Sequence, residues 1–225
     1  MRISVIVPTL NEEKTIAATV AAIQRLQPDE LFIVDGGSTD QTAELCHRLG
    51  VNVISSPRGR SIQMNHGAER ATGEVLLFLH ADTRLPPSAL DDIRAAMNDR
   101  QCPGGRFDVR LDGDHWMLKI IGAMISFRSR VTKIATGDQA IFVRRDVFKS
   151  LGGYPNIPLM EDIALSRALR RVGGVACLHS RVITSGRRWE IEGIWRTIFK
   201  MWTLKSLYLL GVSPVRLKRY YADGR

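Results

Sequence analysis

The chain has 225 residues, of which 44% are hydrophobic and 24% are charged, so its composition is that of a folded globular protein and excludes a largely disordered one. A formal net charge of +9 favours an anionic partner, such as a phosphorylated small molecule, a nucleic acid or an acidic membrane surface. No apolar run reaches the roughly 18 residues that a membrane-spanning helix needs, and the three scattered cysteines lack metal-ligand spacing, which predicts a reducing, cytoplasmic setting.

The first hundred residues alternate between apolar strands and amphipathic helices. Strands are predicted at 3–7, 31–34 and 51–54, with helices after Asn11, over 41–49 and over 61–71. This alternation predicts an α/β fold with a Rossmann-like, mostly parallel sheet that is flanked by helices.

A wholly apolar run at 75–79 ends abruptly in His80-Ala81-Asp82-Thr83. Successive apolar residues fit a central strand that is buried on both faces. Open α/β sheets bind ligands just past the carboxyl ends of their strands, so we expect Asp82 at the mouth of a crevice. The alternative is that Asp82 only caps the next helix.

The elements after residue 100 are less regular. Strands are predicted at 104–111 and 140–143, a helix at 162–172, and two short strands at 175–178 and 182–183. Together with the first half they form one domain.

Two segments of the second half are amphipathic. Residues 116–127 are strongly apolar and precede Arg128 and Arg130, and residues 194–210 mix aromatic side chains with Lys and Arg. Such helices can lie on an anionic lipid surface, and core packing with a solvated basic tail is an equally weighted alternative.

Four polar clusters fall at strand ends or at a helix start: Asn11-Glu12, Asp35, Asp82 and Glu161-Asp162. Parallel strands point the same way, so the first three clusters are expected at one edge of the sheet. Asp35 precedes two glycines, which suits a nucleotide because a carboxylate can accept hydrogen bonds from ribose while glycine lets the backbone approach. The sequence has neither G-x-G-x-x-G nor a P-loop motif.

As a set, five runs of residues resemble glycosyltransferase family 2, over roughly residues 3–190. These runs are Val7-Pro8-Thr9-Leu10-Asn11-Glu12, Val34-Asp35-Gly36-Gly37-Ser38-Thr39-Asp40, Leu77-Phe78-Leu79-His80-Ala81-Asp82, Thr136-Gly137-Asp138-Gln139 and Met160-Glu161-Asp162. A G-R-x-x-Q-M-N motif at 59–65 and the late Arg187-Arg188-Trp189 are similar to those of a small bacterial subgroup of that family.

The resemblance implies a GT-A fold in one domain. It places a nucleotide-binding half at 1–100 and an acceptor half at 101–190, followed by a C-terminal amphipathic helix and basic tail at 191–225. The activity that it implies is inverting transfer of a sugar from a nucleotide-diphosphate sugar to an acceptor hydroxyl, which needs a general base and charge neutralisation at the departing diphosphate.

The resemblance also implies roles for individual residues. Asp162 matches the general base, and Glu161 beside it would orient the acceptor or raise the pKa of Asp162. Asp82 matches a ligand of Mg²⁺ or Mn²⁺ at the diphosphate. The implied nucleotide-sugar-binding residues are Pro8, Thr9, Asn11, Glu12, Asp35, Gly36, Arg60, Ala81, Asp82, Arg188 and Trp189.

The family pattern is broken at His80, at Arg84, where some relatives have a polar residue on the metal side, and at Met64. His80 replaces the first Asp of the D-x-D motif, which makes the metal less firmly held or dispensable, and the charge of Arg84 is a candidate substitute. Many relatives have Arg where this chain has Met64, and Arg60, four residues earlier on the same helix face, is predicted to supply that cation at a helix N-terminus. His179 is a less favoured metal ligand.

Two other functions compete with sugar transfer. A nucleotidyltransferase would favour a Gly/Lys-rich loop after the first strand, whereas residues 11–13 are Asn-Glu-Glu. A non-catalytic nucleotide-sugar or membrane-surface binding module would not need the Glu161-Asp162 pair. No nucleic-acid partner is expected. The sequence leaves open whether the chain lies on the inner face of the membrane and whether its acceptor is lipid-linked. It also leaves open the donor's base and sugar and the oligomeric state.

Overall fold

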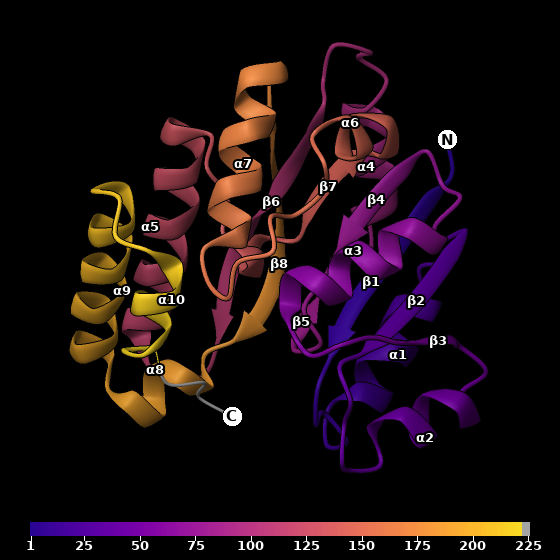
Figure 1. Ribbon diagram of the computed structural model, residues 1–225, viewed down its shortest axis with the longest axis horizontal. Helices are drawn as coiled ribbons and strands as arrows, with labels where there is room; N and C mark the ends of the chain where they lie inside the picture. Colours follow the sequence, from indigo (N-terminus) through magenta and orange to yellow (C-terminus); the bar gives the residue numbers. More distant parts are fainter. Residues whose placement is uncertain (222–225) are drawn as a thin grey trace.

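The computed structural model describes residues 1–221, which fold around one eight-stranded sheet with helices on both faces (Figure 1). The spatial order of the strands is β3-β2-β1-β4-β7-β6-β8-β5. Their bounds are β1 Ile3–Thr9, β2 Glu30–Asp35, β3 Asn52–Ser55, β4 Val75–Phe78, β5 Thr83–Arg84, β6 Gly104–Asp112, β7 Ile141–Arg144 and β8 Ala176–Ser185.

The first four strands of that order form the predicted parallel half. β1 pairs in parallel with β2 on one side and with β4 on the other, and β2 pairs in parallel with β3. Helices α1 (Ile16–Gln24), α2 (Thr42–Arg48) and α3 (Arg60–Arg70) make the crossovers between these strands. The carboxyl ends of β1, β2 and β4 therefore share one edge of the sheet.

The sheet continues as a mixed one. β7 is antiparallel to both β4 and β6, β6 is parallel to β8, and β5 is antiparallel to β8. β6 and β8 thus run in the same direction as β1, and the carboxyl end of β8 reaches the same edge. The two short strands predicted at 175–178 and 182–183 are one continuous strand, β8.

Two apolar layers explain why β4 is apolar at every position. Val75 and Leu77 pack in one cluster with α1 and α4 (Ala89–Ala96), whereas Leu76 and Phe78 pack in the other with α3, α6 (Arg145–Ser150) and α7 (Glu161–Val172). Each side chain of the strand is withdrawn from water on one face or the other, which is what a central strand requires.

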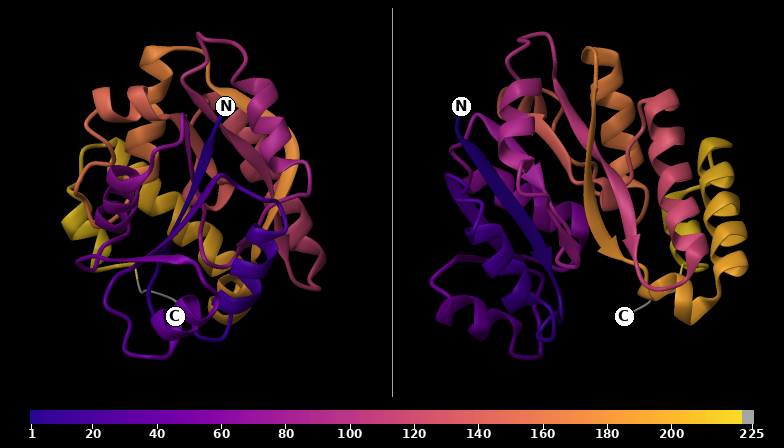
Figure 2. Two further views of the ribbon diagram at one scale, coloured as in Figure 1. Left: turned by 90° about the vertical axis from the view of Figure 1, so that its right-hand side faces the viewer. Right: turned by 180° about the vertical axis from the view of Figure 1, so that it is seen from behind.

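The remaining α-helices lie together, and α7 separates them from β1 (Figures 1 and 2). They are α5 (Trp116–Thr132), α8 (Arg187–Glu192), α9 (Ile194–Leu209) and α10 (Pro214–Lys218). Leu204 of α9 and Leu217 of α10 pack with Met160 and Ile163, which attaches the C-terminal helices to the start of α7. The last residues of the predicted basic tail, 222–225, lie outside the described part of the chain.

Across residues 1–221, every helix is too short or too polar to pass through a lipid bilayer.

Candidate functional site

The loops after β1 and β2 are tied together at the carboxyl edge of the sheet. Asp35, which is buried, accepts hydrogen bonds from the backbone N–H groups of Gly37 (3.0 Å) and Ser38 (2.9 Å). Asn11 Oδ1 accepts from the backbone N–H of Thr39 (2.8 Å), and the backbone N–H of Asn11 donates to Ser38 Oγ (2.9 Å). Asn11 has a left-handed backbone (φ 54°), which asparagine tolerates better than most residues.

The other predicted nucleoside residues lie on the same two loops. Pro8 and Thr9 end β1 and are buried against Val34 and Asp35 of β2. The backbone N–H of Glu12 donates to Thr42 Oγ1 (2.7 Å), and the backbone N–H of Gly36 donates to the Thr9 carbonyl (3.0 Å). The structure therefore brings together the residues that the sequence predicted for the nucleoside.

The side chain of Gln63 in the G-R-x-x-Q-M-N motif is hydrogen-bonded to the carboxyl ends of both β1 and β2. Its Nε2 donates to the carbonyls of Thr9 and Val34, both at 2.8 Å. A Cβ on Gly36 would lie 2.9 Å from the Gln63 amide, so this close packing requires glycine. From the sequence, a function was predicted only for Arg60 of this motif, and the structural role of Gln63 was missed.

Asn65 of the same motif fixes a loop of the second half. Its Nδ2 donates to the Tyr154 carbonyl (2.8 Å), and its Oδ1 accepts from the Tyr154 backbone N–H (2.9 Å). Because Tyr154 is buried beside the carboxylates of the site, burial and then the charges of Asp162 and Glu161 raise its pKa.

Asp82 follows β4 with its side chain exposed at the edge of the sheet. Ala81 before it is buried, and its carbonyl accepts a hydrogen bond from Thr19 Oγ1 (2.6 Å); Thr83 after it donates to Thr184 Oγ1 of β8 (2.9 Å). The surrounding protein reduces the solvation of the Asp82 carboxylate and raises its pKa; the charge of Asp138 adds to this, and that of Arg60 opposes it. The charges of one cation and of a second carboxylate therefore both act on Asp82.

Glu161 and Asp162 begin α7, after Met160 in a left-handed conformation (φ 70°). Asp162 Oδ2 accepts a hydrogen bond from the backbone N–H of Gly137 (2.6 Å). Glu161 is buried and pairs with Arg60 at 3.4 Å, and burial followed by the charge of Asp162 raises its pKa. Arg60 therefore joins the two halves of the site.

His80 lies beside the turn that holds Asp162. A Cβ on Gly137 would lie 2.6 Å from His80 Nε2, so the imidazole packs directly on the backbone of that glycine. His80 and Gly137 line a small pocket whose other walls are Arg60, Met64, Phe78, Ile141 and Tyr154. The position of the missing D-x-D carboxylate is therefore filled by a ring that contacts the Asp162 turn.

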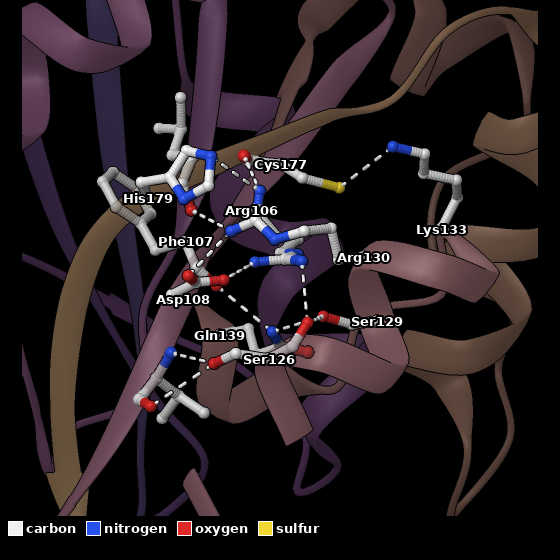
Figure 3. A network of polar contacts seen from close by, with 12 residues as sticks. Arg106, Phe107, Asp108, Ser126, Ser129, Arg130, Lys133, Gln139, Cys177 and His179 are labelled. Carbon is white, nitrogen blue, oxygen red and sulfur yellow. Dashed lines mark hydrogen bonds and ion pairs between the residues drawn. The ribbon is translucent and has the colours of Figure 1, made fainter. Parts of the chain in front are cut away.

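The structure places three other predicted residues away from these carboxylates. Arg84 pairs with the exposed Asp112 at 2.8 Å, and Arg188 stacks over the Tyr221 ring at 4.6 Å. His179 Nε2 lies 3.2 Å from Arg130 Nη1, in a polar network centred on Asp108 (Figure 3). Neither the metal role considered for His179 nor the charge substitution considered for Arg84 gains support from these contacts.

Trp189 packs against the α5 and α9 helices. It contacts an apolar cluster that contains Leu118 and Ile194, and it lines an open groove with Trp116 and Trp195. Arg188 and Trp189 follow the carboxyl end of β8, the same edge of the sheet as Asp82, but their side chains turn toward the C-terminal helices.

Three charged residues that were not among the predicted site residues lie near Asp162. The charges of Asp138 and Asp162 act on both Arg128 of α5 and Lys205 of α9. Asp138 belongs to one of the quoted family runs, which could have identified it. Arg128 and Lys205 fall within or beside the amphipathic segments, and the sequence alone gave no sign that α5 and α9 converge.

A divalent cation fits this site only with help from a bound diphosphate. Asp82 offers one accessible carboxylate, and within residues 1–221 no group of three or more His, Cys, Asp or Glu side chains could hold a metal by itself. Mg²⁺ is often held by one or two carboxylates and substrate phosphates together, so Asp82 and a diphosphate form a suitable set of hard oxygen ligands.

Comparison with known sequences gives a consistent result. Residues 4–152 match the family model described as Glycosyl transferase family 2. A PGL/p-HBAD biosynthesis glycosyltransferase of Mycobacterium bovis is 32% identical over 164 residues, which cover 67% of this chain and 62% of that protein. The probable glycosyltransferase YdaM of Bacillus subtilis is 26% identical over 96% of this chain and 56% of its own length. The chain thus spans less than two thirds of these relatives.

Comparison with solved structures supports the fold. Staphylococcus aureus TarS 1–349 in complex with UDP-GlcNAc has a TM-score of 0.61 at 20% identity, over 82% of this chain and 58% of that one. Glucosyl-3-phosphoglycerate synthase from Mycobacterium tuberculosis, in complex with Mn²⁺, UDP and glucosyl-3-phosphoglycerate, has a TM-score of 0.61 at 18% identity, over 82% and 70%. These likenesses confirm the predicted GT-A arrangement.

Proposed function

Because this chain belongs to glycosyl transferase family 2, we propose that it transfers a sugar from a nucleotide-diphosphate sugar to an acceptor hydroxyl, with inversion at the anomeric carbon. The observation that carries the proposal is the convergence of Asp82, Arg60 and Asp162 beside the joined loops of β1 and β2. The complexes of TarS with UDP-GlcNAc and of glucosyl-3-phosphoglycerate synthase with UDP support a uridine nucleotide as the first donor to test.

The donor would bind at the edge formed by β1, β2 and β4. The loops that contain Pro8, Thr9, Asn11, Glu12, Asp35 and Gly36 would hold the nucleoside, since they are already fixed to one another by hydrogen bonds. Arg60 begins α3, where its guanidinium and the exposed N–H groups of the helix both favour an anionic diphosphate. Ala81 and Asp82 lie at this edge; the remaining predicted donor residues, Arg188 and Trp189, follow β8, with their side chains against Tyr221 and the cluster of α5 and α9.

Asp82 would hold Mg²⁺ or Mn²⁺ together with the two donor phosphates. The cation, when bound, would neutralise charge on the diphosphate as it leaves. The Mn²⁺ complex of glucosyl-3-phosphoglycerate synthase supports Mn²⁺ as the first metal to test, by comparing activity in chelator with activity in added Mn²⁺. Full activity in chelator would remove Asp82 from this role.

Asp162 would act as the general base. Its carboxylate would take the proton of the acceptor hydroxyl while the acceptor oxygen bonds to the anomeric carbon and the bond from that carbon to the diphosphate breaks. The Gly137 N–H holds Asp162 Oδ2 in place, and the Arg60–Glu161 pair fixes the start of α7. A base that faces the acceptor in a single displacement accounts for inversion.

The experiment that tests this function is turnover of labelled nucleotide sugars by the intact chain and by Asp162→Asn. We expect donor cleavage by the wild type to fall by about 100-fold or more in Asp162→Asn, because general base catalysis contributes about 10²–10⁴ in rate. UDP affinity should stay unchanged. Asp91→Asn, an exposed carboxylate on α4, is the matched control and should keep wild-type turnover. Unchanged turnover in Asp162→Asn would refute the assignment of the base.

The second half also presents an apolar face, which we propose rests on the anionic cytoplasmic face of a membrane. On α5 the exposed Trp116, Ile120, Met124, Phe127 and Val131 recur at helical spacing. On α9, Trp195, Phe199 and Trp202 are 64%, 69% and 65% exposed.

The exposed cations beside these aromatic side chains support an anionic lipid surface as the partner of that face. The two helices pack together through Ile121 and Ile198, and the exposed cations Arg196, Arg216 and Arg219 lie on α9 or at its C-terminal side. Aromatic side chains beside arginines suit the headgroup region of an anionic bilayer. The match to part of an undecaprenyl-phosphate 4-deoxy-4-formamido-L-arabinose transferase of Pectobacterium carotovorum, 31% identical over 39% of this chain and 31% of that protein, is in keeping with a lipid-linked acceptor.

A further inference from the structure

Two cations, Arg128 and Lys205, lie near Asp162 and have no role in the function proposed above. Arg128 comes from α5 and Lys205 from α9, so two helices distant in sequence each bring one cation to the same place. Packing contacts and charge interactions locate both of them relative to the proposed base.

A hydrogen bond of the neighbouring residue Ser129 shows where this part of α5 lies. Gln139 Nε2 donates to Ser129 Oγ at 2.8 Å, which fixes α5 against the turn that contains Gly137 and Asp138 (Figure 3). That turn also supplies the N–H that holds Asp162. In the described chain, Arg128 Nη2 and Asp138 Oδ1 are buried atoms without hydrogen-bond partners, so the guanidinium has an unused donor there.

Lys205 is located by its neighbour Leu204. Leu204 is 3% exposed and packs in one cluster with Met160 and Ile163, the residues on either side of Glu161-Asp162. The packing of Leu204 brings α9 to the start of α7, and the charge of Asp162 there acts on Lys205.

Among residues 1–221, the acidic side chains near the two cations balance their charge only in part. Burial lowers the pKa of Arg128, and burial followed by the charge of Arg128 lowers the pKa of Lys205. Asp138 and Asp162 compensate only in part. Two half-buried cations that repel each other form a receptor for an anion, because a bound anion would relieve the repulsion and accept the unused hydrogen bonds.

The anion that fits here differs from the donor diphosphate. The charge of Asp138 acts on Asp82 as well as on Arg128 and Lys205, so the two places adjoin. The cation that acts on Asp82 is Arg60, whereas the charge of Asp162 acts on Arg128 and Lys205. The donor end of the site thus has its own cation, and the second pair lies beside the base.

We propose that Arg128 and Lys205 bind a phosphate or carboxylate group of the acceptor, and so place its hydroxyl at Asp162. The proposal rests on the proposed function, since it requires an acceptor. The anionic group can belong to a soluble phosphorylated compound or to a lipid headgroup. Arginine is suited to this role because its planar fork can donate two hydrogen bonds to one phosphate or carboxylate.

The test is calorimetric titration of the intact chain in the presence of saturating UDP, so that phosphate probes cannot occupy the donor site. The probes are glycerol 3-phosphate against glycerol, and farnesyl phosphate against farnesol in the same detergent. We expect at least one phosphate probe to bind ten times more tightly than its neutral partner. Binding of both phosphates supports recognition of the phosphate alone, and binding of farnesyl phosphate alone supports a lipid headgroup.

The double variant Arg128→Gln/Lys205→Gln should lose that tenfold preference, while its Kd for UDP should stay within twofold of the wild type. Arg128→Lys should keep part of the preference, and thermal unfolding checks that each variant is folded. Arg171→Gln/Lys149→Gln, which removes two exposed cations elsewhere, is the matched control.

The proposal is overturned if neither phosphate probe is preferred, if the double variant keeps the preference, or if it instead weakens UDP binding. If the proposed function itself is wrong, the wild type will neither bind UDP nor cleave the donor.

Discussion

The two halves of the molecule prepare their ligand sites in different ways. In the first hundred residues, the loops after β1 and β2, which we propose hold the nucleoside, are joined to one another by side-chain hydrogen bonds of Asp35, Asn11 and Gln63. In the second half, α5 and α9 carry exposed aromatic side chains and two cations, Arg128 and Lys205, which Asp138 and Asp162 compensate only in part within the described chain. If the proposed sites are correct, the protein combines donor loops that its own hydrogen bonds fix with an acceptor region whose cations are completed by the ligand.

Gly137 lies where the two halves meet, so Gly137→Ala should have the largest effect. The new Cβ would lie 2.6 Å from His80 Nε2, so either the turn that holds Asp162 or the imidazole must move. Because a misplacement of about 1 Å can cost about 100-fold in rate, we expect kcat to fall by about that factor with little change in UDP affinity. Steady-state kinetics on a nucleotide sugar measure both.

The double variant His80→Ala/Gly137→Ala tests whether the contact with His80 causes the loss of rate. Removing the imidazole makes room for the Cβ, so part of the lost rate should return. If the double variant is as slow as Gly137→Ala, the contact with His80 is not what positions the turn.

Gln63→Leu should affect the donor half alone. The substitution removes the donor to the Thr9 and Val34 carbonyls, and loss of a buried hydrogen-bond partner costs about 1–3 kcal/mol of unfolding free energy. UDP affinity should also fall, because the ends of β1 and β2 lose their common support. Urea denaturation and UDP titration measure the two effects, with the exposed Gln101→Leu as control. Equal stability of Gln63→Leu and wild type would contradict the role of Gln63.

Glu161→Gln should change how stability depends on pH. The pKa of Glu161 is raised in the folded chain, so the folded state binds its proton more tightly than the unfolded state does. The stability that this proton contributes is complete below the ordinary glutamate pKa of about 4.3 and is lost as the pH rises through the folded value. Relative to the wild type, Glu161→Gln should therefore gain stability as the pH rises from 4 to 7.

Urea denaturation at several pH values measures this change. Glu13→Gln, an exposed carboxylate after β1, is the control and should follow the wild type. A Glu161→Gln variant that loses stability relative to the wild type as the pH rises would reverse the sign and contradict the account.

Trp195→Ser/Trp202→Ser should have the smallest effect on folding, within about 0.5 kcal/mol, because both indoles are exposed. The same variant should lose flotation with vesicles that contain anionic lipid, and wild-type flotation should weaken with added salt. Val172→Ser, an exposed apolar residue of α7, is the control. Equal flotation by the double variant and the wild type would refute the lipid face and leave the donor half unaffected.

The donor half was largely predictable from the sequence. The apolar run of β4 and the polar residues at the ends of β1, β2 and β4 are local patterns, and parallel strands bring those ends together. The second half was harder because its structure depends on long-range pairing. β7 enters the sheet between β4 and β6, and polar residues such as Ser180 and Arg181 hide the continuity of β8.

The same reason explains which site residues were missed. Asp162 follows from a local pair of acidic residues at a helix start. Arg128 and Lys205 are 77 positions apart and meet only through the packing of α5 and α9 around α7, which no local pattern encodes. Gln63 and Asn65 were visible as a motif, but their backbone partners could be identified only in the fold.

The central claim is a single displacement at the anomeric carbon, with Asp162 facing the acceptor and the donor held by the first half. The most direct test is proton NMR of the sugar that the wild type forms or releases from a UDP-α-sugar, recorded in the first minutes before the anomers equilibrate. The account predicts that the new sugar has the β configuration, and that Asp162→Asn abolishes its formation while UDP still binds. A product with the α configuration would contradict it.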